Sequence, residues 1–221
     1  MRLTLMIGVF VLCLCAHFAW AGTDPYQIET IGACTGKTLA ETVRGALQPQ
    51  GVRLMDGKGA VTAEVWLRRA VPANVSRDNE GYRAVGQGTL VGVLHFPVQG
   101  TDFRGQLIKP GYYTLRYVQM PSDGNHMGAA SSSDFLLLIP GMADKNLEAQ
   151  PKFDELVKLS RQASGTNHPG VLMLISARKS SPTALQQNEQ GHWAVVLKGS
   201  GEGNKSVSLS FAVVLIGKAE G

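Results

Sequence analysis

The sequence predicts a mainly β fold, an antiparallel β-sandwich that carries two short α-helices. Seven segments are rich in β-branched, aromatic and aliphatic residues, whereas only two have helical spacing. The last of the seven, Val207–Ile216, alternates apolar residues with Ser208 and Ser210. Such a strand has one face in water, which antiparallel sheets permit and parallel sheets rarely do. Many strands and few helices favour a sandwich over a doubly wound fold.

Residues 1–21 are predicted to be a cleavable signal peptide, which implies a secreted or periplasmic protein. Arg2 is followed by an apolar run without acid or lysine, and Ala19-Trp20-Ala21 places small residues at the two positions that signal peptidase requires. The alternative is an uncleaved membrane anchor, because the run is about long enough, roughly 20 residues, to cross a bilayer.

Residues 22–221 are predicted to form a single domain, because no long linker or low-complexity run divides them. Without residues 1–21 the chain loses Arg2 but none of its 17 acids, so its net charge is about +3. The basic residues are scattered, and nucleic acid is therefore not an expected partner. Cys34 remains as the one cysteine of the domain, so we expect no internal disulfide and interpret it as a small buried hydrophobic residue.

Two segments have the signals of helices. Lys37–Leu47 has apolar residues at four-residue spacing and stops at the turn residues 48–51. Pro151–Ala163 opens with a proline and places Asp154 and Glu155 in its first turn, where acids are favourable.

The predicted strands are bounded by clusters of Gly, Pro, Asp and Ser, which are typical of turns. In chain order they are Val61–Leu67, Thr89–Phe96, Tyr112–Met120, Phe135–Ile139, Val171–Ser176, Trp193–Leu197 and Val207–Ile216.

One strand and its turn carry a family resemblance. Residues 109–117, Lys-Pro-Gly-Tyr-Tyr-Thr-Leu-Arg-Tyr, resemble the Pro-Gly-x-Tyr-x-Leu turn and strand of secreted bacterial β-sandwich domains, including carboxypeptidase-regulatory-like (transthyretin-type) modules. The longer stretch through 123–128 and 134–138 is similar to a family of exported bacterial β-sandwich proteins of uncharacterised role. The resemblance implies a sandwich and an export context. It implies no activity, because fold does not imply function.

Two predicted loops, 125–128 and 167–170, share the pattern Asn-His-x-Gly. Imidazole and carboxylate are ligands of divalent metals, and the same groups can supply a general base and its orienting acid. The structural alternative is that Asn, Gly, Asp and Pro simply form tight turns. The candidate metal ligands are His126, His168 and Asp123, and the candidate ligand-binding residues are Asn125, Asn167 and Asp134.

Five aromatic residues offer another hypothesis. Trp66, Trp193, Tyr112, Tyr113 and Tyr117 would build a sugar-stacking face if their rings were exposed, whereas at strand spacing such rings more often fill the core.

These observations predict an exported, non-enzymatic β-sandwich domain that binds a small ligand or an envelope partner. No group of residues specifies a reaction, and no cofactor is expected unless the two Asn-His loops hold a divalent metal. Membrane contact is expected only through a retained signal segment. The two alternatives are a metal-binding or metal-dependent site formed by those loops and a carbohydrate-binding module.

Overall fold

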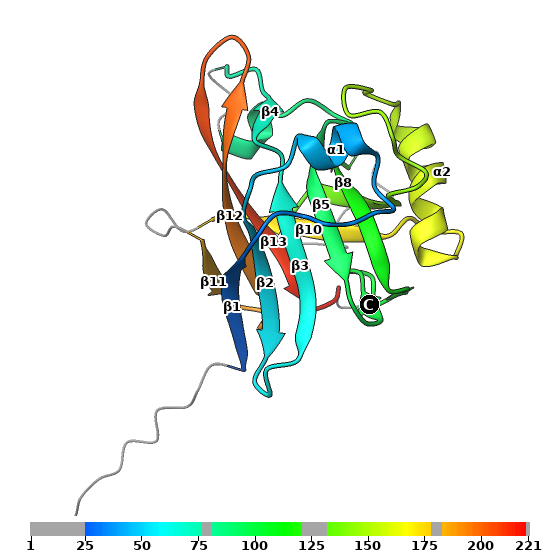
Figure 1. Ribbon diagram of the computed structural model, residues 1–221, viewed down its shortest axis with the longest axis vertical. Coiled ribbons are helices and arrows are strands. Elements are labelled where there is room, and N and C mark those ends of the chain that lie inside the picture. Colours follow the sequence, from blue (N-terminus) through cyan, green and yellow to red (C-terminus); the bar gives the residue numbers. More distant parts are fainter. Residues whose placement is uncertain (1–24, 77–80, 121–131, 178–182, 220–221) are drawn as a thin grey trace, which may run out of the picture.

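The computed structural model describes residues 25–76, 81–120, 132–177 and 183–219 and is mainly β, as predicted. Figure 1 shows a strongly curled sheet with two helices on its outside. The strands are β1 (Tyr26–Ile31), β2 (Gly51–Asp56), β3 (Val61–Leu67), β4 (Ala70–Pro72), β5 (Leu90–Phe96), β6 (Gly100–Thr101), β7 (Leu107–Ile108), β8 (Gly111–Gln119), β9 (Asp134–Pro140), β10 (Val171–Ile175), β11 (Ala184–Gln187), β12 (Trp193–Glu202) and β13 (Val207–Ile216). The helices are α1 (Glu41–Gly45), α2 (Phe153–Ser164) and a 3-10 turn, η1 (Gly81–Ala84).

The main sheet has the strand order β1-β2-β3-β5-β8-β9-β10-β13-β12-β11 and is antiparallel, apart from β4, which pairs in parallel with β12. Strands β6 and β7 form a separate small ribbon. Only Leu174 and Ile175 of β10 pair with β13, and the sheet bends there so that β12 contacts β3 and β11 contacts β1. The predicted antiparallel, mainly β fold is confirmed. The strands that face each other across the main core belong to one continuous sheet that curls back on itself.

The main hydrophobic core lies inside this curl. The alternation predicted for Val207–Ile216 is present, since Leu209, Phe211 and Val213 point into the core while Ser208 is exposed. Strands on both sides of the curl contribute to the same cluster, including Leu54, Val65, Leu94, Leu115, Leu138 and Leu172.

The two helical segments cover the outer face of the sheet. Residues 32–47, including the short α1, lie against β3, β5 and β8 and bury Cys34, Leu39 and Val43 with Trp66. Cys34 is buried and free, as predicted. Helix α2 packs on β9 through Leu156 and ends at Gly165, whose left-handed φ of 66° favours glycine.

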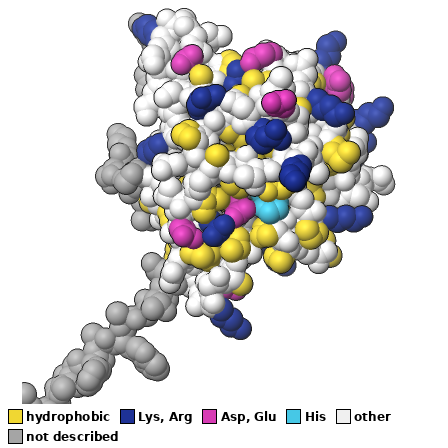
Figure 2. All heavy atoms as spheres, in the orientation of Figure 1, with side chains coloured by type: hydrophobic (Ala, Val, Ile, Leu, Met, Phe, Trp, Pro, Cys, Tyr) yellow, Lys and Arg dark blue, Asp and Glu magenta, His cyan; other side chains and the backbone are white. Residues whose placement is uncertain are grey.

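Charged side chains of both signs are interspersed over the face in Figure 2, in agreement with the scattered charge of the sequence. Within the described ranges, no helix is long and apolar enough to cross a membrane. The predicted signal peptide, residues 1–21, lies outside the described residues.

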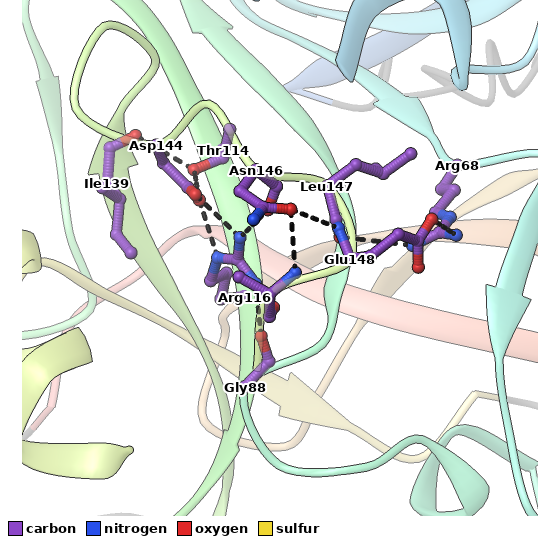
Figure 3. A network of polar contacts seen from close by, with 10 residues as sticks. Arg68, Gly88, Thr114, Arg116, Ile139, Asp144, Asn146, Leu147 and Glu148 are labelled. Carbon is purple, nitrogen blue, oxygen red and sulfur yellow. Dashed lines mark hydrogen bonds and ion pairs between the residues drawn. The ribbon is translucent and has the colours of Figure 1, made fainter. Parts of the chain in front are cut away.

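A buried ion pair fixes a long loop against the outer face of β8 (Figure 3). Arg116 is fully buried, and its Nε and one Nη donate to the two carboxylate oxygens of Asp144, both at 2.7 Å. Its remaining N–H groups donate to the carbonyls of Gly88, Asn146 and Ala149 at 2.6–2.7 Å. All five guanidinium donors are therefore satisfied, which a buried charge requires.

We predict that Asp144→Ala lowers the free energy of unfolding by about 3 to 5 kcal/mol, because it leaves a buried guanidinium without its counter-charge. Chemical denaturation measures this loss. The matched control is Glu29→Ala, which removes the acid of the Arg53–Glu29 ion pair, whose side chains are 33% and 54% exposed. That variant should lose less than about 1 kcal/mol. Equal losses in the two variants would contradict the structural role of Arg116.

Candidate functional site

The candidate metal site is only partly within the described structure. His126, Asp123 and Asn125 lie outside the described residues, so the metal site stays a prediction. His168 and Asn167 are exposed in the loop that follows α2. In the described part of the chain, no three His, Cys, Asp or Glu side chains lie close enough together to hold a metal ion.

The His168 loop is held by short-range hydrogen bonds. The Thr166 hydroxyl accepts from the backbone N–H of His168 at 3.0 Å, and the Ser164 hydroxyl donates to its carbonyl at 2.6 Å. These are the contacts of a turn stabilised by hydroxyl side chains, which was the structural alternative for this loop.

Asp134 is fully buried at the start of β9. Its carboxylate accepts a hydrogen bond from the Tyr117 hydroxyl at 2.6 Å and lies 3.4 Å from Nε of Arg83. Burial, followed by the hydrogen bond to Asp134, raises the pKa of Tyr117. The described contacts of Asp134 thus join β8, β9 and η1, and its role as a ligand contact stays a prediction.

Most of the aromatic residues proposed for sugar stacking are inside the fold. Trp66 is 4% exposed and its indole N–H donates to the Gly32 carbonyl at 2.8 Å. Tyr113 and Tyr117 are also buried in the main core. Trp193 is half-buried with its ring edge-on to Tyr26, at a centroid distance of 5.8 Å. Trp66, Tyr113 and Tyr117 therefore offer no exposed ring face to a sugar.

Five side chains form a row across the outer face of the sheet, which we call the outer-face row: Glu29, Arg53, Glu64, His95 and Tyr112. They are direct cross-strand partners in β1, β2, β3, β5 and β8. Arg53 lies 3.3 Å from Glu29 and 2.7 Å from Glu64, and Nδ1 of His95 lies 2.9 Å from the other Glu64 oxygen. The Tyr112 ring stacks on His95 at a centroid distance of 4.0 Å, while Gly36 packs against the same tyrosine ring.

The charges of the outer-face row satisfy one another. Burial alone would raise the pKa of Glu64, but the hydrogen bonds from His95 and Arg53 outweigh burial and lower it. Cys34 packs against Tyr112 in the same outer cluster, and burial raises the pKa of its thiol. A protonated thiol is a weak nucleophile. The outer-face row itself has the properties of a cross-strand ion-pair network that stabilises the sheet.

A cleft opens where the two ends of the curled sheet approach each other; we call it the seam cleft. Its volume is about 100 Å³. Thr30, Gln50 and Thr183 are exposed around it, and Gln48 spans its top by donating from Nε2 to the Lys198 carbonyl at 3.2 Å. Its remaining lining residues are Gly51, Val52, Val65, Leu67 and Leu197.

The chemistry of the seam cleft is a polar mouth over an aliphatic floor. Val52, Val65, Leu67 and Leu197 are all buried and belong to the main core, so the floor of the cleft is the edge of that core. Within the described residues, the side chains of Thr30, Gln50 and Thr183 bond to no other residue. Small-ligand sites have volumes of about 300 to 1,000 Å³, so a cleft of about 100 Å³ would enclose only part of such a ligand.

The sequence contained little signal for this cleft. Gln48 and Gln50 stand in the stretch that predicted the end of the first helix, and Thr30 belongs to a strand that was not predicted. Thr183 comes from the opposite end of the sheet. Comparison with protein-family models, curated proteins and solved structures found no match.

We predict that Glu64→Gln destabilises the protein in a pH-dependent way. The pKa of Glu64 is lower in the folded state, so its ionised form adds stability above its unfolded pKa, about 4.3, and this stability is lost as the pH falls through the folded pKa. The variant should lose about 1 to 3 kcal/mol at pH 7 and much less at pH 3.

Denaturant unfolding at both pH values measures this difference. Glu29→Gln is the control, because the Glu29 side chain is 54% exposed and its removal should cost less than about 1 kcal/mol at either pH. A loss in Glu64→Gln that is the same at pH 7 and pH 3 would show that the charge of Glu64 is not what stabilises the row.

Proposed function

We propose that the protein is an exported, non-enzymatic binding domain that holds a small ligand in the seam cleft. The observation that carries the proposal is the lining of the cleft, where Thr30, Gln50 and Thr183 converge above buried aliphatic side chains. Hydroxyl and amide groups at an exposed mouth fix the orientation of a ligand through hydrogen bonds.

The seam cleft supports binding better than the outer-face row does. Both oxygens of Glu64 already accept hydrogen bonds, from Arg53 at 2.9 Å and from His95 at 2.9 Å. A ligand at the row would have to replace these contacts, and disrupting satisfied ion pairs is unfavourable.

Export rests on residues 1–21, whose apolar run and Ala19-Trp20-Ala21 pattern favour a cleaved signal peptide. In an extracytoplasmic setting, a domain of this kind would serve as a binding component of the envelope. The bound group could then be a free small molecule or a group that an envelope partner carries.

We predict that a bulky residue at the mouth abolishes binding. Thr30 is exposed at the cleft, so Thr30→Trp should fill the mouth without disturbing the core. The probes are glycerol, acetamide, glycolate and ethanolamine, each titrated into isotope-labelled protein while backbone amide signals are recorded by NMR. At least one probe should shift the signals of Thr30, Gly51 and Leu197 in the unchanged protein, and none should do so in Thr30→Trp.

The matched control is Thr101→Trp, which places the same side chain on another exposed strand threonine, in β6, outside the cleft lining. It should bind as the unchanged protein does. Failure of all four probes to shift the cleft signals, or binding that survives in Thr30→Trp, would contradict a ligand site at the seam.

A further inference from the structure

We infer that the outer-face row contains a binding position for a divalent transition-metal ion at Nε2 of His95. The inference goes beyond the proposed function and is independent of the seam cleft. It follows from three features of the row: the tautomer that Glu64 imposes on the imidazole, the contacts that hold the ring in place, and the charge of the row itself.

Glu64 determines which nitrogen of His95 carries the proton. Burial alone would raise the pKa of Glu64, but the hydrogen bonds from His95 and Arg53 lower it, so the side chain is an ionised carboxylate at neutral pH. A carboxylate only accepts hydrogen bonds, so Nδ1 of His95, which lies 2.9 Å from Oε2 of Glu64, carries the ring proton. In the neutral imidazole, Nε2 therefore has the lone pair that a metal ion requires.

The His95 ring is held in place while its Nε2 is left free. Tyr112 stacks on the ring at a centroid distance of 4.0 Å and an interplanar angle of 11°, and Tyr112 is itself packed against Gly36. Among the described residues, Nε2 makes no hydrogen bond, and the His95 side chain is 20% exposed to solvent. A metal ion at Nε2 therefore displaces no contact of the row.

The Glu64–His95 pair has the arrangement of a metal-binding histidine. Such a histidine almost always donates its other ring N–H to a carboxylate, a carbonyl or water, which fixes the tautomer and raises the basicity of the ligating nitrogen. Here the two residues are direct cross-strand partners in β3 and β5, so the sheet itself holds the carboxylate behind the ring. The contacts of His168, by contrast, are made by its backbone, and within the described residues no carboxylate contacts its imidazole.

The charge of the row favours a cation. Two acids, Glu29 and Glu64, are paired with one base, Arg53, so the row has a net charge of −1 when the imidazole is neutral. Imidazole nitrogen suits Zn²⁺, Cu²⁺ and Ni²⁺, whereas Mg²⁺ and Ca²⁺ prefer oxygen ligands. One protein ligand leaves the other coordination positions to water. The inferred site is therefore an open one, in which a group from a partner can complete the coordination.

The test is a titration of the full chain with Zn²⁺ at neutral pH, recorded through the backbone amide signals of isotope-labelled protein. Zn²⁺ should shift the signals of His95 and Tyr112. His95→Gln removes the imidazole and should abolish these shifts. Glu64→Gln keeps the imidazole but removes the charge that orients it, so it should weaken Zn²⁺ binding at His95 by about tenfold or more.

Two variants are the matched controls. Glu29→Gln removes the same charge from the row at a residue that pairs with Arg53 and does not contact His95, so it should change the affinity at His95 by less than about threefold. His168→Gln removes an exposed imidazole outside the row and should leave the shifts at His95 unchanged.

Two results would overturn the inference. One is a titration in which Zn²⁺ leaves the signals of His95 and Tyr112 in place in the unchanged protein. The other is equal weakening in Glu64→Gln and Glu29→Gln, since binding would then depend on the net charge of the row and not on an oriented imidazole. If Glu64→Gln does not fold, persistence of the Zn²⁺ shifts in His95→Gln overturns the inference by itself. The seam cleft has its own probes and signals, so its test is decided separately.

Discussion

The buried guanidinium of Arg116 is the constraint on which the outer wall of the molecule depends. The free-energy cost of burying this charge is offset only if each N–H donor has an acceptor. The acceptors are the carboxylate of Asp144 and the carbonyls of Gly88, Asn146 and Ala149. The loop after β9 must therefore return to β8 before α2 begins. Helix α2 then starts at Phe153 and covers β9. One charge thus fixes the path of a loop and the position of a helix.

The curl of the sheet accounts for the position of the seam cleft. The sheet bends at the short β10–β13 pairing, and this bend brings its two terminal strands, β1 and β11, into contact. Among the described residues, no backbone ladder pairs β1 with β11. At one end of this seam, Tyr26 packs against Trp193 and fills the gap with ring surface. At the other end the residues are Thr30, Gln50 and Thr183, which are too small or too polar to fill it, and the gap remains as a cleft.

The outer-face row and the seam cleft show how alternate residues of the same strands have different roles. Arg53 and Glu64 stabilise the outer face by pairing with neighbours, while Val52 and Val65, one residue away, form the floor of the cleft. Because the side-chain period of a strand is two, a shift of register by one residue would exchange these faces. The burial of Val52 and Val65 therefore also places Arg53 and Glu64 on the outer face.

Local pattern in the sequence determined the fold class, the strands with continuous apolar runs and helix α2, because these depend on neighbouring residues alone, whereas α1 spans only Glu41–Gly45 of the predicted Lys37–Leu47. Val61–Leu67 and Val207–Ile216 form strands over the predicted residues, and α2 ends within one residue of its predicted end. Strands β1 and β11 were not predicted, since each is short, interrupted by Gln or Glu, and defined only by its partner. Only the tertiary structure decided that one sheet curls on itself, that Arg116 is buried, and that Thr30, Gln50 and Thr183 meet. These features depend on contacts between residues far apart in the chain, and no local period records such contacts.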